Sequence, residues 1–77
     1  MTVAFVLLNT DLGAEQEVII KMNGIKGVTE THFLYGVYDI ISKVEADTTD
    51  GVKEIMHRIR DLEQVKSTLT MIVVGDS

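Results

Sequence analysis

The feature that most constrains the fold of this chain is an internal repeat, in which residues of the first half have counterparts 37 positions later, as Val18 and Ile55 show. Five apolar pairs follow this offset: Val18 with Ile55, Ile19 with Met56, Met22 with Ile59, Ile25 with Leu62, and Val28 with Val65. The spacing within each set is helical up to the fourth member, and the fifth opens a segment whose apolar residues alternate. The repeat predicts two β-α-β units related by pseudo-symmetry.

The remaining apolar pattern predicts four strands around these two helices. Val3–Leu8 is an uninterrupted apolar run, which is typical of a strand covered on both faces. Residues 28–35, 38–46 and 65–74 alternate with the period of two expected of strands that are covered on one face. The helices fall between, over residues 11–23 and 51–62.

Short polar and glycine segments predict where these elements begin and end. Thr10 or Asp11 is expected to cap the first helix, and the cluster at residues 47–50 to begin the second. Gly24 and Gly27 are expected to end the first helix, where a left-handed residue favours glycine. The pair Gly36-Val37 predicts a two-residue type II′ hairpin between the second and third strands.

The order β-α-β-β-α-β predicts an α+β, ferredoxin-like fold over residues 1–77 as a single domain. Its four-stranded antiparallel sheet would have the first and third strands at the centre and both helices on one face. The other face would expose apolar residues of at least three strands. Since a large exposed apolar patch on a small domain usually marks an association site, we expect a homodimer through this face.

Composition narrows the function classes. A 77-residue domain buries a modest fraction of its surface, so it often needs disulfides, a metal or a partner subunit, and this chain has no cysteine. Its net charge of −5, with the seven basic residues scattered, argues against a direct nucleic-acid surface. The longest apolar run is too short to span a membrane, and residues 1–3 show no targeting signal. We expect a cytoplasmic protein.

Few residues indicate a catalytic, metal-binding or ligand-binding site. His32 and His57 lie apart with no ligand spacing between them, so we expect no metal, no cofactor and no catalytic site. Thr68 and Thr70 share one face of the last strand, and Asp39 lies in the entry to a strand, where aspartate is disfavoured. The two hydroxyls and the amides near Gly36 suit a small carboxylate, and Asp39 suits an ammonium group. Together they predict an amino-acid site, for which strand propensity alone is the competing explanation.

The sequence resembles a known family at these residues. The segment Leu34–Ala46 is similar to the Gly-x-Tyr-Asp turn and following strand of the Lrp/AsnC transcription regulators. Residues 25–31 and 65–74 also fit, and the resemblance covers essentially the whole chain. It matches the C-terminal effector-binding domain of that family, called RAM.

The resemblance implies a dimer formed through the sheets, assembly into rings of dimers, and amino-acid effectors bound between dimers. Carried over to this chain, the site residues are Gly36, Val37, Tyr38, Asp39, Ser67, Thr68 and Thr70. Full members carry an N-terminal helix-turn-helix, whereas Met1 stands at the first predicted strand. We therefore expect a stand-alone RAM domain that does not bind DNA itself, and mixed assembly with full-length regulators would suit it.

Two alternatives remain. One is an assembly protein with no functional ligand pocket. The other is a small dimeric α+β barrel enzyme, with His32 as its acid–base residue, although the sequence places no second catalytic group beside it. The ACT domain, an unrelated amino-acid-binding module, has the same predicted topology, so topology alone does not assign a function.

Overall fold

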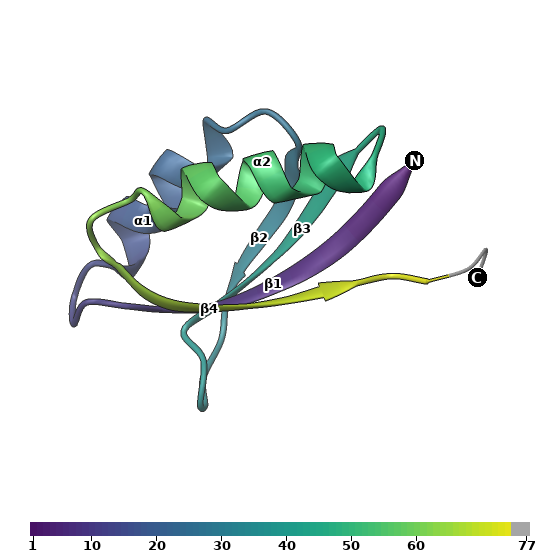
Figure 1. Ribbon diagram of the computed structural model, residues 1–77. Coiled ribbons are helices and arrows are strands. Elements are labelled where there is room, and N and C mark those ends of the chain that lie inside the picture. Colours follow the sequence, from purple (N-terminus) through teal and green to yellow (C-terminus); the bar gives the residue numbers. More distant parts are fainter. Residues whose placement is uncertain (75–77) are drawn as a thin grey trace.

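The computed structural model describes residues 1–74 and has the predicted order of elements (Figure 1). The strands and helices are β1 (Thr2–Thr10), α1 (Glu15–Asn23), β2 (Val28–Phe33), β3 (Ile40–Ala46), α2 (Thr49–Arg60) and β4 (Val65–Ile72). No helix in this part of the chain is long and apolar enough to cross a membrane. The predicted tail at residues 75–77 lies outside the described residues.

The four strands form one antiparallel sheet in the order β2-β3-β1-β4, so β1 and β3 are central as predicted. Both helices lie on the same face of this sheet (Figure 1). In β1 the side chains alternate strictly: Ala4, Val6 and Leu8 are fully buried, and the residues between them are partly exposed. The apolar run of β1 therefore serves two faces, of which only one is covered by helices.

The core lies between the helices and the covered face of the sheet. The four buried residues of α2 repeat at helical spacing, and α1 contributes Val18 and Met22. The remaining buried apolar residues come from the two central strands: Ala4, Val6, Leu8, Ile40 and Val44. Two of the repeat pairs, Val18 with Ile55 and Met22 with Ile59, are buried in both halves, as the repeat predicts.

The opposite face of the sheet carries a second set of apolar side chains, which we call the open face. It comprises Val3, Phe5, Leu7, Ile41, Leu69 and Met71, which the strand register places side by side on one side of the sheet. Leu69 is 45% and Met71 47% exposed. Polar residues of β2 and β3, including Glu30 and Lys43, border it. Within the described chain, neither helix packs on this face (Figure 1).

The predicted ends of the helices are partly wrong. The second helix begins as expected, because the Thr48 side chain accepts a hydrogen bond from the Gly51 amide at 3.1 Å. Neither Thr10 nor Asp11 caps the first helix, which begins at Glu15 after Ala14 with no side-chain cap. The reason is that β1 extends through Thr10, and the Asp11 carbonyl accepts from the Ala14 amide in a turn that precedes the helix. Of the two glycines after this helix, only Gly27 is left-handed, with φ of +100°.

The tight hairpin predicted at Gly36-Val37 is also wrong, although its strand register is the observed one. Phe33 pairs with Ile40, which continues the register that a two-residue turn at Gly36-Val37 requires. The paired strands end there, and residues 34–39 form a longer loop in which Gly36 lacks the positive φ of a type II′ turn. Asp39 is bonded to the end of β1 through both its amide and its side chain, which draws the loop away from a tight turn.

The two glycines Gly27 and Gly36 are therefore expected to differ in their tolerance of a side chain. A Cβ at residue 27 would lie 2.9 Å from the Glu45 carbonyl oxygen and collide with the Ile55 side chain, at a φ that disfavours any L-residue. We expect Gly27→Ala to lower the free energy of unfolding by about 2–4 kcal/mol in urea denaturation. Gly36→Ala, whose Cβ would meet open space, should change it by less than about 0.5 kcal/mol. A large loss on Gly36→Ala would contradict the loop described here.

Candidate functional site

The loop of residues 34–39 contains four of the predicted site residues. It projects from the sheet on the side away from the helices (Figure 1), and Tyr35 and Val37 near its tip are almost fully exposed. Its base is fixed by Asp39. The Asp39 carbonyl accepts from the Leu34 amide at 2.8 Å, and the Asp39 amide donates to the Leu8 carbonyl at 3.0 Å.

The Asp39 side chain also bonds to the end of β1, and it does so through one of its two carboxylate oxygens. Its Oδ2 accepts from the Thr10 amide at 2.9 Å, and this contact is partly buried. Among the described residues, no cationic side chain forms an ion pair with Asp39. A carboxylate that is held by the backbone and lacks a counter-ion is suited to receive a cationic group.

The three hydroxyl residues of β4 divide between the two faces of the sheet. Ser67 lies on the side of the open face, where its Oγ accepts from Asn9 Nδ2 at 3.4 Å. Thr68 and Thr70 lie together on the helix side, as predicted, because they stand opposite buried residues of β1. Within one chain, the structure therefore gathers Thr68 with Thr70 but not with the loop of residues 34–39.

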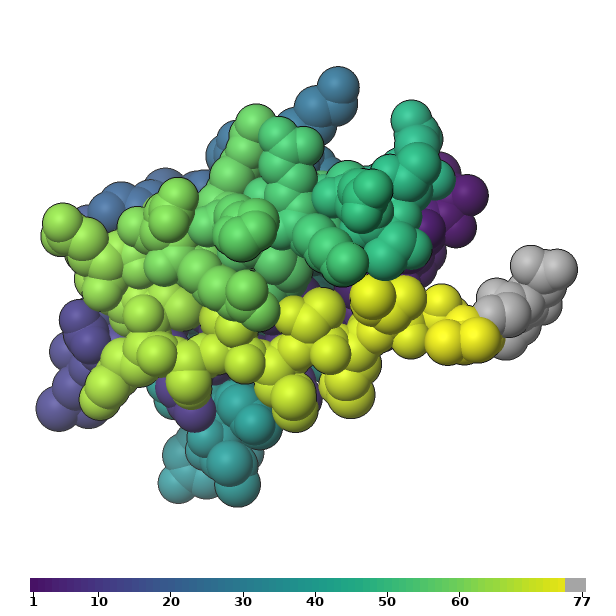
Figure 2. All heavy atoms as spheres, in the orientation of Figure 1, coloured from purple at the N-terminus to yellow at the C-terminus, as the bar shows by residue number. Residues whose placement is uncertain are grey.

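Thr68 and Thr70 adjoin a groove between α2 and β4, which we call the α2–β4 groove. Figure 2 faces the side of the molecule where α2 (green) lies against β4 (yellow). The groove has a volume of about 340 Å³, and its lining residues are Val52, Lys53, Met56, His57, Arg60, Thr70 and Ile72. Arg60 contacts β4 there, because its Nε donates to the Thr68 hydroxyl at 3.2 Å.

Sequence reasoning missed the basic residues of this groove. Lys53, His57 and Arg60 are spaced four and three positions apart, which places them along one side of α2. That spacing is visible in the sequence, but which strand faces this side of α2 is decided only by the fold. The groove therefore combines a cationic side with an apolar floor, an arrangement suited to an amphipathic anion.

The Thr70 hydroxyl has no hydrogen-bond partner in the described structure, although its oxygen is buried. A buried hydroxyl without a partner costs free energy, so it is an unusual feature for a folded core to retain. Thr70 also lines the α2–β4 groove, so this buried hydroxyl belongs to a residue beside the groove.

A larger hollow, of about 630 Å³, lies at the end of β3 that contains Ala46, between that strand and α2. It contains none of the predicted site residues. Its charges are of both signs, and Arg58 there lies 3.8 Å from Glu54. This mixture gives no preference for either sign of ligand.

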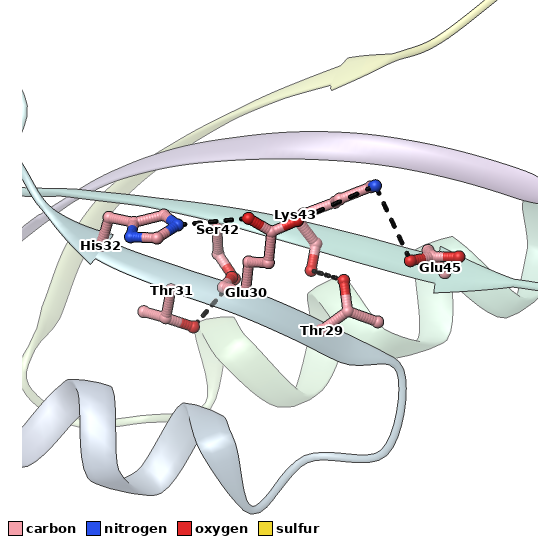
Figure 3. A network of polar contacts seen from close by, with 7 residues as sticks. All are labelled: Thr29, Glu30, Thr31, His32, Ser42, Lys43 and Glu45. Carbon is pink, nitrogen blue, oxygen red and sulfur yellow. Dashed lines mark hydrogen bonds and ion pairs between the residues drawn. The ribbon is translucent and has the colours of Figure 1, made fainter.

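A polar network on β2 and β3 contains His32 (Figure 3). The Glu30 carboxylate lies 3.3 Å from His32 Nε2 and 3.9 Å from Lys43 Nζ, and Lys43 Nζ lies 4.0 Å from Glu45. The His32 side chain is mostly exposed. Over residues 1–74, no group of three or more histidine or acidic side chains is placed to hold a metal ion.

Comparison by sequence identifies similar proteins along most of the chain. The family model described as the Lrp/AsnC ligand binding domain matches residues 3–76. A helix-turn-helix transcriptional regulator of Pyrococcus furiosus is 35% identical over 75 residues, which is 92% of this chain and 50% of the regulator. Homocitrate synthase of Sulfolobus acidocaldarius is 42% identical over 50 residues, 65% of this chain and 11% of the enzyme. The chain thus spans half of one relative and a small part of the other.

Solved structures share the fold. The crystal structure of FFRP-DM1 superposes with a TM-score of 0.91 at 39% identity, covering 96% of this chain and 100% of that one. A feast or famine regulatory protein from M. tuberculosis, solved in complex with L-methionine, has a TM-score of 0.80 at 20% identity. It covers 99% of this chain and 52% of its own.

The unpartnered Thr70 hydroxyl predicts a gain in stability on its removal. Thr70→Val should raise the free energy of unfolding by about 1 kcal/mol, because a methyl group replaces a buried group that has no hydrogen bond. The control is Thr31→Val, whose hydroxyl lies 3.3 Å from Ser42 Oγ and which should lower it instead. Urea denaturation measures both. A loss of stability in Thr70→Val would show that its hydroxyl is satisfied in solution.

Proposed function

This chain belongs to the Lrp/AsnC ligand-binding domain family, and from that premise we propose that it is a regulatory module that binds a small amino-acid effector and self-associates. The proposal concerns the domain itself and does not extend to DNA binding. The observation that carries it is Asp39, a carboxylate held by the backbone of β1 at the base of an exposed loop and left without a counter-ion in the described structure.

The relatives support a regulatory role for the domain. The same domain type occurs in a helix-turn-helix regulator, and a related segment occurs in homocitrate synthase. A domain found in both a transcription regulator and an enzyme is suited to a task that the two proteins can share, such as the response to a small molecule. The M. tuberculosis relative was solved with L-methionine, and this supports an amino acid as the effector here. The matched segment of homocitrate synthase is about a tenth of that enzyme, so we propose no enzymatic activity for this chain.

Self-association would join the parts of the amino-acid site that one chain keeps apart. The loop of residues 34–39 and the pair Thr68 and Thr70 lie on different sides of the sheet. In a ring of dimers, the loop of one dimer can meet the last strand of the next. Asp39 would then receive the ammonium group of the effector, and the hydroxyls with the amides near Gly36 would receive its carboxylate. The exposed side chains of Tyr35 and Val37 would be covered in that contact.

The mechanism follows from linkage. An effector that binds between dimers favours the assembled state over separate dimers, and it shifts the population by its difference in affinity for the two. Mixed assembly with full-length regulators of the same family would transmit that shift to them. A helix-turn-helix regulator that matches this chain over half its own length is the kind of partner we propose.

The open face is the proposed dimer interface. Leu69→Glu should raise the dissociation constant of the dimer by about 100-fold, because it would bury a charge without a partner. Ile20→Glu is the matched control. Ile20 is 65% exposed on α1, on the helix side of the sheet, and its substitution should leave the dimer intact. Sedimentation velocity measures both variants. A dimer that is weakened by Ile20→Glu and not by Leu69→Glu would place the interface on the helices.

A thermal-shift screen of the amino acids tests effector binding. An effector present at 100 times its dissociation constant should stabilise the protein by about 2.7 kcal/mol. Asp39→Asn should then weaken its binding by about tenfold, because the variant removes the charge but keeps an oxygen to accept from the Thr10 amide. Calorimetry measures the affinity. An unchanged affinity would exclude Asp39 as the ammonium partner.

The competing function is an assembly protein without a ligand. It is favoured by one observation, namely that a single chain does not bring its candidate site residues into one pocket. A stable oligomer that shows no thermal shift with any amino acid would support this function over effector binding.

A further inference from the structure

We infer that the α2–β4 groove of a single chain binds an aliphatic carboxylate that carries no ammonium group, such as a branched oxo acid. This goes beyond the proposed function, because the groove needs neither Asp39 nor a second copy of the chain. The two proposals share Thr70 and also Thr68, whose hydroxyl accepts from Arg60 beside the groove, and they differ in the ligand and in the charged residues that confer its affinity.

The charged side chains that line the α2–β4 groove favour an anion. The protein carries a net charge of −5, yet the side chains with ionisable groups that line this groove are all basic: Lys53, His57 and Arg60. Within residues 1–74, none of the three forms an ion pair with a carboxylate. By contrast, Lys21 and Arg58, which also lie on helices, each pair with a glutamate four residues before them. The groove thus concentrates unpaired positive charge on an acidic protein.

Helix stability alone does not account for this arrangement. Cations in the last turn of a helix interact favourably with its dipole, and His57 and Arg60 lie in that turn of α2. Lys53 lies near the beginning of the helix and gains nothing from the dipole. Arg60 is held toward β4 by its hydrogen bond to the Thr68 hydroxyl, so its guanidinium is already positioned beside the groove. A bidentate guanidinium is well suited to a carboxylate.

The floor of the groove is apolar. Val52 and Met56 are buried beneath it, and Ile72 forms its β4 side while remaining 41% exposed. Ile72 therefore supplies the exposed apolar surface for an aliphatic tail, with Val52 and Met56 beneath the groove, and the volume of about 340 Å³ is within the range of small-molecule sites. Thr70 also lines this space, and its hydroxyl oxygen is buried there without a hydrogen-bond partner among the described residues.

The groove disfavours ligands of other chemical classes. Among the residues that the structure describes, no acidic side chain lines it, so the ammonium group of an amino acid would find no counter-ion there and would face Lys53, His57 and Arg60. An inorganic anion would gain from the charge but not from the floor. An apolar molecule would gain from the floor but leave the cations unused. An aliphatic carboxylate without an ammonium group would gain from both the basic side chains and the apolar floor.

Ketoisocaproate and leucine provide the test, because they share a carbon skeleton and differ in the ammonium group. We expect amide NMR spectra of the labelled full chain to shift saturably with ketoisocaproate at residues of α2 and β4 that line the groove. Leucine should bind these residues at least about tenfold more weakly. Inorganic phosphate, which lacks a tail, should also bind at least about tenfold more weakly.

Substitutions on α2 assign the binding to the groove. Arg60→Gln should raise the dissociation constant for ketoisocaproate by about tenfold, and Arg58→Gln, the same charge change on the other side of the helix, by less than about twofold. Lys53→Gln is a second variant, which breaks no hydrogen bond or ion pair of the described structure and should also weaken binding. Absence of shifts in the groove, shifts that persist in both Arg60→Gln and Lys53→Gln, or equal binding of leucine or phosphate there would overturn the inference.

The same spectra separate this inference from the proposed function. If leucine shifts the amides of residues 34–39 and ketoisocaproate shifts nothing, the groove inference fails and the amino-acid site stands. If ketoisocaproate binds the groove and no amino acid stabilises the protein, the groove inference stands and the amino-acid site fails.

Discussion

The rest of this structure depends on one constraint: both helices lie on the same face of a four-stranded sheet. The covered face forms the core, because the buried side chains of β1 and β3 meet the buried residues of both helices. The uncovered face keeps the apolar alternates of the same strands. One apolar side of β1 is therefore covered by the helices of the same chain. We propose that a second copy of the chain covers the other side.

The same arrangement explains where the candidate ligand contacts lie. Since β4 is an edge strand, its helix-side residues are covered by α2 alone, and the gap between the two becomes the α2–β4 groove. Thr70 lines that groove, and its buried hydroxyl has no hydrogen-bond partner among the described residues. The loop of residues 34–39 joins the other edge strand to β3 and is displaced to the opposite side, because Asp39 bonds to the end of β1. The sheet thus lies between the α2–β4 groove and the loop of residues 34–39.

The fold was predictable from the sequence to a large extent, but the first helix cap and the turn between β2 and β3 were not. The 37-residue repeat reproduces the two helices, since Val18 with Ile55 and Met22 with Ile59 occupy matching buried positions. Periodicity succeeds there because a buried stripe repeats over several turns. The predictions of the tight hairpin and of the first helix cap were wrong. A long-range contact such as that of the Thr10 amide with the Asp39 carboxylate outweighs the preference of a few turn residues. Such contacts join positions far apart in the sequence and leave no local pattern.

The candidate site shows the same division. The sequence by itself determined the order of elements, the two apolar faces of β1, the shared face of Thr68 and Thr70, and the resemblance to the family. It did so because periodicity and motifs are local properties. Only the tertiary structure decided that α2 presents Lys53, His57 and Arg60 to β4, and that the loop of residues 34–39 projects on the side of the sheet away from the helices. The physical reason is that the neighbours of an edge strand and the position of a loop are set by packing between elements, which no segment encodes alone.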